Sequence, residues 1–182
     1  MTPESRAFSK RDAPRVGVVG AGGLGVHHVR ILRDLCGGRF AGFFDENPGR
    51  AADVATQHGV RMYPSLAAML DEVDAVSIVV PTTAHHAVAS AAIDRGKHVF
   101  VEKPLALDEE QLRAVEEAAA TATGLLMVGF NRRFAPLAVA MRGALAGRGP
   151  VVAAYRVNAG PLPPGHWLND PEVGGGRIIG EG

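Results

Sequence analysis

Short apolar runs alternate along the chain with longer segments whose apolar positions recur every three or four residues. The apolar runs predict six strands, at residues 15–19, 40–45, 61–63, 75–80, 98–101 and 125–128. The segments between them predict helices, at residues 24–35, 48–58, 65–70, 83–94 and 109–122. Strands without polar alternation that are separated by helices are typical of a parallel sheet covered on both faces. The predicted fold class is therefore α/β, with a doubly wound parallel sheet.

Two of these helices carry clear start signals. Asn47 followed by Pro48 is typical of an N-cap and of the first helical position. Asp108 should cap the helix at residues 109–122, with Gln111 at the capping-box position. That helix is expected to bury one apolar stripe, formed by Leu112, Val115, Ala119 and Ala122.

The pattern changes after residue 128. Residues 136–145 predict a further helix and residues 151–158 a strand, whereas residues 160–182 are rich in glycine and proline and show no period. We therefore expect a flexible arm at residues 1–13, a doubly wound domain at residues 14–131, and the incomplete start of a second α/β domain with an open sheet at residues 132–182.

Composition and charge exclude several classes of function. The 182 residues contain 19 Lys and Arg against 19 Asp and Glu, so no basic excess favours nucleic-acid binding. The single cysteine, Cys36, rules out an internal disulfide framework and a cysteine-rich zinc site. The sequence shows no signal peptide and no run of about 20 apolar residues that would span a membrane. We expect a cytoplasmic protein without nucleic-acid, membrane or metal partners.

A glycine-rich turn, Gly20-x-Gly22-x-x-Gly25, lies between the first predicted strand and the first predicted helix. Gly20 permits a tight turn, Gly22 lets the backbone approach a pyrophosphate, and Gly25 allows the helix to pack closely on the strand. The start of the helix offers free N–H groups and a partial positive charge to phosphates. The turn, including Gly23 and Leu24, is therefore a candidate binding site for a dinucleotide.

Asp45 lies twenty residues beyond Gly25, at the end of the second predicted strand. A carboxylate at this place can accept a hydrogen bond from the 2′-hydroxyl of an adenosine ribose and would repel a 2′-phosphate, so NAD is favoured over NADP. Arg50 could turn toward such a phosphate, which keeps NADP as the alternative. Two other interpretations remain: a helix-packing turn in which Asp45 caps a loop, and a methyltransferase that binds S-adenosylmethionine.

Two further strand ends carry polar residues where an open α/β sheet binds its ligands. The fourth predicted strand runs into a segment that contains Pro81, Thr82 and His85. The fifth runs into Glu102 and Lys103, and Pro104 should keep Lys103 extended at the edge of the sheet. A lysine there could hydrogen-bond a reacting hydroxyl or help to remove its proton. The alternative is a strand-end ion pair between Glu102 and Lys103.

These motifs, together with Asn131 and Arg132 in the run Gly-Phe-Asn-Arg-Arg-Phe, resemble those of the Gfo/Idh/MocA oxidoreductase family. The resemblance implies an N-terminal NAD(P)-binding Rossmann domain, at residues 14–131, and a C-terminal α/β domain. It also implies an enzyme that transfers a hydride between a nicotinamide and a CH–OH carbon of a sugar, cyclitol or nucleotide sugar.

The resemblance also assigns roles to residues. It makes Lys103 the catalytic residue in contact with the substrate and places Glu102 beside the nicotinamide half of the cofactor. The crevice for the cofactor would be lined by Pro81, Thr82 and His85. The substrate side would be lined by Asn131 and Arg132. His166 and Trp167 are candidates for a wall of the sugar site, with a loop anchor as the alternative.

Members of the family are longer than this chain, and their catalytic histidine follows a glycine-rich turn in the second domain. The sequence stops at Gly182 before such a histidine, so we expect a truncated chain that binds NAD and turns over poorly. A non-catalytic dinucleotide-binding protein, acting as a sensor or a partner, is the alternative function. The full-length form is expected to take a small polyhydroxylated substrate and to form a homo-oligomer.

Overall fold

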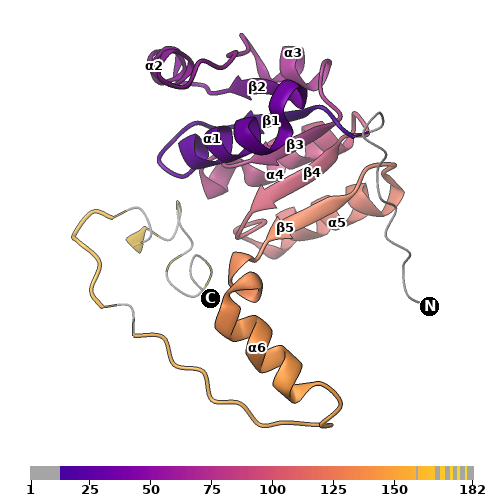
Figure 1. Cartoon of the computed structure of the whole chain (residues 1–182), viewed down its shortest axis with the longest axis vertical. Helices are drawn as coiled ribbons and strands as arrows, with labels where there is room; N and C mark the ends of the chain where they lie inside the picture. Colours follow the sequence, from indigo (N-terminus) through magenta and orange to yellow (C-terminus); the bar gives the residue numbers. More distant parts are fainter. Residues whose placement is uncertain are drawn as a thin grey trace. The chain divides into compact units, whose positions relative to one another are not determined.

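The computed structural model describes residues 13–158, 160–166, 169, 170, 173, 176 and 179. The chain divides into two compact units, Met1–Val128 and Gly129–Gly182. In the first unit, a single sheet carries helices on both faces (Figure 1). The arm expected at residues 1–13 lies outside the described residues, apart from residue 13.

The sheet has the strand order β2-β1-β3-β4-β5. Its strands are β1 (Val16–Val19), β2 (Phe40–Phe44), β3 (Ala75–Ile78), β4 (His98–Glu102) and β5 (Leu126–Gly129). β1 pairs in parallel with β2 on one side and with β3 on the other, and β3 pairs in parallel with β4. The predicted doubly wound α/β fold is confirmed. The chain reverses its direction of winding beside β1, and open sheets of this kind bind ligands at such a reversal.

The strands are connected by α1 (Gly25–Cys36), η1 (Gly37–Arg39), α2 (Pro48–His58), α3 (Leu66–Leu70), α4 (Thr82–Ile93) and α5 (Glu109–Thr121). Two predicted caps are present. The Asn47 side chain accepts a hydrogen bond from the N–H of Arg50, and the Asp108 side chain accepts one from the N–H of Gln111. The start of α1 differs, because no side chain caps it.

Apolar side chains fill both faces of the sheet. On one face, α1 and α2 bury a cluster that includes Val18, Val29, Phe43 and Val54. On the other face, α3, α4 and α5 bury a larger cluster that includes Met69, Ile78, Ala89, Val101 and Val115. Neighbouring residues of β1 point to opposite faces, so Val18 belongs to the first cluster and Val19 to the second.

The strand predicted at residues 61–63 is wrong. Met62 forms only an isolated parallel bridge with Phe43. The chain then turns, so that the Tyr63 side chain is buried and Ser65 caps α3 two residues later. One bridge beside β2 therefore replaces the third predicted strand, because α3 begins before a ladder can extend.

The buried stripe predicted on α5 is wrong at Leu112, whose surface is 37% exposed. Val115 is fully buried, and the small side chains of Ala118, Ala119 and Ala122 pack partly against the same cluster. The face that α5 buries is therefore shifted toward its carboxyl-terminal half.

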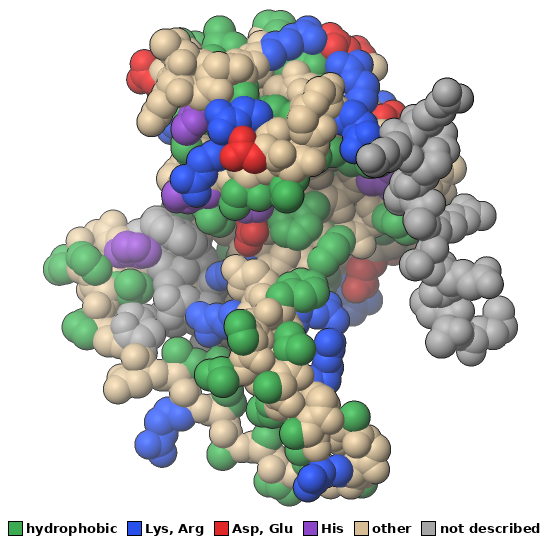
Figure 2. All heavy atoms as spheres, in the orientation of Figure 1, with side chains coloured by type: hydrophobic (Ala, Val, Ile, Leu, Met, Phe, Trp, Pro, Cys, Tyr) green, Lys and Arg blue, Asp and Glu red, His purple; other side chains and the backbone are tan. Residues whose placement is uncertain are grey.

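The second unit contains η2 (Asn131–Phe134) and α6 (Pro136–Leu145), which confirms the predicted helix. Apolar side chains are exposed along α6 (Figure 2), and Leu137 is 85% exposed. The strand expected at residues 151–158 is wrong: these residues are exposed, and among the described residues they have no strand partner to supply hydrogen bonds. Of the helices in the described part of the chain, none is long and apolar enough to cross a membrane.

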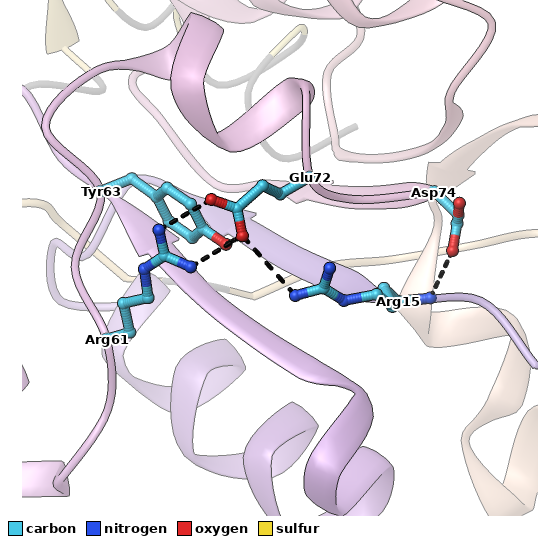
Figure 3. A network of polar contacts seen from close by, with 5 residues as sticks. All are labelled: Arg15, Arg61, Tyr63, Glu72 and Asp74. Atoms are coloured by element: carbon cyan, nitrogen blue, oxygen red, sulfur yellow. Dashed lines mark hydrogen bonds and ion pairs between the residues drawn. The ribbon is translucent and has the colours of Figure 1, made fainter.

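A carboxylate network ties together segments at the amino ends of the central strands (Figure 3). Glu72 accepts two hydrogen bonds from the Arg61 guanidinium, at 2.7 and 2.8 Å, and one from the Tyr63 hydroxyl at 3.1 Å. The Arg15 guanidinium lies 3.7 Å from the same carboxylate, and the Arg15 N–H donates to Asp74. The hydrogen bonds from Arg61 hold the pKa of Glu72 below its ordinary value.

Substitution of Glu72 tests this network. Glu72→Gln should lower Tm by about 1–3 °C at neutral pH, because Arg61 and Arg15 lose the charge that they face. Since the pKa of Glu72 is lower in the folded chain, its stabilisation is present above the unfolded-state pKa and is lost as the pH falls through the folded-state value. The Tm difference between wild type and variant should therefore shrink as the pH falls below 4.5, the ordinary value for this carboxyl.

Glu109→Gln is the control, because Glu109 pairs with Arg113 across one exposed turn of α5. It should shift Tm less than Glu72→Gln does. Thermal unfolding monitored by circular dichroism across pH measures both variants, and a Glu72 effect that stays constant into acid would contradict the assignment.

Paired truncations test the packing of α5. Val115→Ala should reduce the free energy of unfolding by about 2 kcal/mol, because it opens a cavity in a closed core. Leu112→Ala removes more atoms from a more exposed position and should cost less than Val115→Ala. Urea denaturation of both variants measures the difference, and an equal or larger loss for Leu112→Ala would show that the predicted stripe was correct.

Candidate functional site

Two glycines fix the turn after β1. Gly20 has a φ of +91°, and a Cβ there would lie 2.6 Å from the carbonyl oxygen of Val79. Its N–H donates to the carbonyl oxygen of Phe44 at 2.8 Å. A Cβ on Gly25 would overlap the carbonyl oxygen of Gly20, so α1 can start this close to the turn only with glycine. Both positions therefore match the roles predicted from the sequence.

The middle of the same turn is open. A Cβ on Gly22 or Gly23 would meet nothing within 4 Å, and the Leu24 side chain is half exposed. The start of α1 behind them has no side-chain cap. Uncapped N–H groups and the positive end of the helix dipole attract an anion, and Gly22 leaves space for one to approach the backbone. These residues fit a pyrophosphate.

Asp45 lies buried directly after β2 and accepts four hydrogen bonds. Its Oδ2 accepts from the N–H of Ala21 at 2.7 Å and from Arg50 Nε at 3.0 Å. Its Oδ1 accepts from the N–H of Asn47 and from Arg50 Nη2, each at 2.8 Å. Burial raises the pKa of Asp45, but the hydrogen bonds from Arg50, Ala21 and Asn47 outweigh burial and hold the pKa below its ordinary value. The group is therefore an ionised carboxylate at neutral pH.

His85 connects the loops that follow β3 and β4. Its Nδ1 lies 2.6 Å from the carbonyl oxygen of Pro104, and its Nε2 lies 3.0 Å from that of Val80. The side chain is only 2% exposed. Of its predicted companions in the cofactor crevice, Pro81 is exposed and Thr82 is buried. His85 is thus placed to hold the two loops together behind the surface that Pro81 presents.

Glu102 is the last residue of β4 and is almost fully buried. Its Oε1 lies 3.4 Å from Nε2 of His28, and Nδ1 of His28 lies 2.9 Å from the Ser77 hydroxyl. Burial lowers the pKa of His28, and the nearby Glu102 carboxylate opposes this only in part. Lys103 follows at the edge of the sheet, half-buried, and its peptide bond to Pro104 is cis.

The sequence did not reveal the partners of two of these carboxylates. His28, which the sequence did not single out for the site, joins α1 to β3 and β4 through Ser77 and Glu102. Its place three residues after Gly25 is the only sequence signal that it could face the sheet. Arg50 was considered for a phosphate, and the structure pairs it with Asp45 instead.

The remaining predicted residues belong to the second unit. Asn131 and Arg132 are exposed on η2, where Arg132 Nη1 lies 3.5 Å from the Tyr155 hydroxyl. His166 is half-buried, and Trp167 lies outside the described residues. Within the described part of the chain, no three His, Cys, Asp or Glu side chains are grouped to hold a metal ion.

Two curated proteins are similar to this chain. The UDP-N-acetylglucosamine 3-dehydrogenase of Acidithiobacillus ferrooxidans is 43% identical over 122 residues, which cover 67% of this chain and 38% of that protein. Its solved structure has a TM-score of 0.68 and 42% identity, over 72% of this chain and 43% of that one. Inositol 2-dehydrogenase 3 of Saccharopolyspora erythraea is 42% identical over 126 residues, 66% of this chain and 37% of that protein.

A further solved structure contains a dinucleotide: a protein of gentamicin A biosynthesis in complex with NAD. It has a TM-score of 0.65 and 31% identity, over 73% of this chain and 39% of that one. The chain thus spans less than half the length of these relatives. Residues 14–130 match the oxidoreductase family described by an NAD-binding Rossmann fold. With the glycine turn and buried Asp45 at the reversal of the sheet, this match places the chain in the Gfo/Idh/MocA oxidoreductase family.

Proposed function

We propose that the protein is an NAD-dependent oxidoreductase that acts on a CH–OH group of a sugar, a cyclitol or a nucleotide sugar. One observation carries the proposal: the open glycine turn, the buried Asp45 and Lys103 all follow strands at the carboxyl edge of one sheet. The two similar curated proteins, which act on a nucleotide sugar and on inositol by name, support the substrate class.

The dinucleotide is proposed to lie across this edge. The N–H groups at the start of α1 bind its pyrophosphate where Gly22 leaves the backbone open. Asp45 accepts hydrogen bonds from the adenosine ribose. Glu102, which His28 holds in place, lies on the side of the nicotinamide, and Pro81 contributes to the wall of the crevice.

A bound nicotinamide would supply the acceptor for a hydride from the substrate carbon, and the proton on the hydroxyl oxygen of that carbon would pass to water. The proposed role of Lys103 is to donate a hydrogen bond to that oxygen, which stabilises the negative charge that develops as the proton leaves. Asn131, Arg132, His166 and Trp167 remain proposals for contacts with the hydroxyl groups and apolar face of the substrate.

Two alternatives make different predictions. A methyltransferase would bind S-adenosylmethionine, which the membership of an oxidoreductase family argues against. A non-catalytic sensor would bind the dinucleotide and leave it chemically unchanged. Calorimetric titration with NAD, NADP and S-adenosylmethionine, followed by an assay for NADH formation, separates these functions.

The glycines of the turn should respond differently to the same added methyl group. Gly22→Ala should bind NAD about tenfold more weakly, equivalent to about 1.4 kcal/mol, because the methyl group occupies the approach of the pyrophosphate. Its Tm should remain within about 1–2 °C of wild type, since no protein atom lies near the new Cβ. Gly25→Ala should instead lower Tm clearly, because its Cβ overlaps Gly20. Calorimetry and thermal unfolding check both, and undiminished NAD binding by Gly22→Ala would oppose the proposed site.

Lys103 should be needed for turnover and not for dinucleotide binding. In the chain joined to the C-terminal half of a similar dehydrogenase, with myo-inositol or UDP-N-acetylglucosamine as substrate, Lys103→Ala should reduce the rate of NADH formation by about 100-fold or more, because the reacting oxygen loses its hydrogen-bond donor. Lys97→Ala, which removes the same charge at the amino end of β4, is the matched control. Wild-type turnover in Lys103→Ala would contradict the assigned role. Binding of NAD without NADH formation by the wild-type sequence, even when it is joined to the C-terminal half of a similar dehydrogenase, would favour the sensor.

A further inference from the structure

We infer that Arg50 competes with the ribose of NAD for the Asp45 carboxylate and thereby sets the preference of the site between NAD and NADP. The inference rests on the proposed function, because it requires that the adenosine ribose binds at Asp45. Arg50 affects which dinucleotide binds and takes no part in hydride transfer.

The Asp45 carboxylate has no acceptor capacity left for a ribose. Each carboxylate oxygen has two lone pairs, and each already accepts two hydrogen bonds. Oδ2 accepts from Ala21 N–H at 2.7 Å and from Arg50 Nε at 3.0 Å. Oδ1 accepts from Asn47 N–H and from Arg50 Nη2, each at 2.8 Å. A ribose hydroxyl can bind only after one of these donors has left.

Only Arg50 can leave without disturbing the fold. The N–H groups of Ala21 and Asn47 belong to the backbone that follows β1 and precedes α2, and their hydrogen bonds fix those segments to the end of β2. The Arg50 side chain is 48% exposed, so its guanidinium can move into water and remain hydrated. The Asp45 side chain is 2% exposed and cannot move toward solvent to meet a ligand in another place.

Departure of Arg50 frees one lone pair on each oxygen of Asp45. Two adjacent acceptors match the two adjacent hydroxyls of a ribose, so NAD binding exchanges two hydrogen bonds from Arg50 for two from the sugar. The measured affinity for NAD is then reduced by the ion pair that has to be broken. Removal of the Arg50 guanidinium should therefore tighten NAD binding, although it removes a cation from a site that binds an anionic ligand.

A 2′-phosphate reverses the sign of this effect. The phosphate replaces one of the hydroxyls that Asp45 would accept, and its charge is repelled by the carboxylate. A guanidinium binds phosphate through two parallel hydrogen bonds, and Arg50 lies in the first turn of α2, next to the same carboxylate. Arg50 is therefore a new partner for NADP, whereas for NAD it is only a competitor.

Calorimetric titration of the 182-residue chain with NAD and with NADP tests the inference. Arg50→Met keeps the apolar stem and removes every donor. It should bind NAD about two- to fivefold more tightly, the range for a half-exposed ion pair. It should bind NADP about tenfold more weakly, as expected for loss of a charged hydrogen-bonding pair.

Arg61→Met is the matched control. Arg61 is a half-exposed arginine that also binds a carboxylate through two hydrogen bonds, but its partner Glu72 lies near the amino ends of the strands. It should leave the ratio of NAD to NADP affinity unchanged.

The outcomes distinguish this inference from the proposed function. If the wild-type chain binds NAD and Arg50→Met binds NAD equally or more weakly, Arg50 is no competitor and the inference fails while the proposed function stands. If NADP affinity survives the substitution, the assigned phosphate contact is overturned. If wild type binds neither dinucleotide, the proposed function itself fails, and the inference falls with it.

Discussion

A buried carboxylate holds the three segments that meet at the reversal of the sheet. Asp45 follows β2, and it accepts hydrogen bonds from the backbone after β1, through Ala21, and from the backbone before α2, through Asn47. Without this acceptor, the buried N–H of Ala21 would lose its partner, and an unmatched buried donor costs about 1–3 kcal/mol. The carboxylate that is proposed to bind a ribose is thus also part of the framework that shapes its own site.

Two buried or half-buried histidines connect the segments on the other side of the reversal. His85 lies between the loops after β3 and β4, with one ring nitrogen beside the carbonyl oxygen of Val80 and the other beside that of Pro104. His28 joins α1 to Glu102, so that the helix proposed to bind the pyrophosphate and the strand end proposed to lie beside the nicotinamide are connected by one side chain. Buried polar groups with two partners fix geometry more firmly than apolar contacts do, because a displaced group loses directional bonds. The loops at the carboxyl edge are therefore preorganised by histidines that need not touch a ligand.

The sequence was sufficient where a feature depends on neighbours in the chain. The caps at Asn47 and Asp108 and the left-handed turn at Gly20 are local, and all three are present. The order of apolar runs and helices was enough for the doubly wound class. Where pairing or packing over a distance decides, the predictions were wrong: residues 151–158 lack a strand partner in the described chain, and Leu112 faces partly outward on α5.

In the candidate site, too, the features set by neighbours in the chain could be predicted and those set by distant contacts could not. The glycine pattern and the spacing to Asp45 located the turn and the acid, because both are read along the chain. The number of hydrogen bonds that Asp45 accepts could not be read in this way, since it depends on the rotamer of Arg50 and on how closely Ala21 approaches. That number changes how Asp45 is interpreted. Its spacing in the sequence identifies it as an available acceptor, but in the folded chain it already accepts four hydrogen bonds. Substitution of Asp45 would alter the framework and the proposed ribose contact together. Substitution of Arg50 alters the competition between Arg50 and the ribose for Asp45 and leaves the backbone hydrogen bonds of Asp45 in place. Arg50 is therefore the position at which binding can be separated from folding.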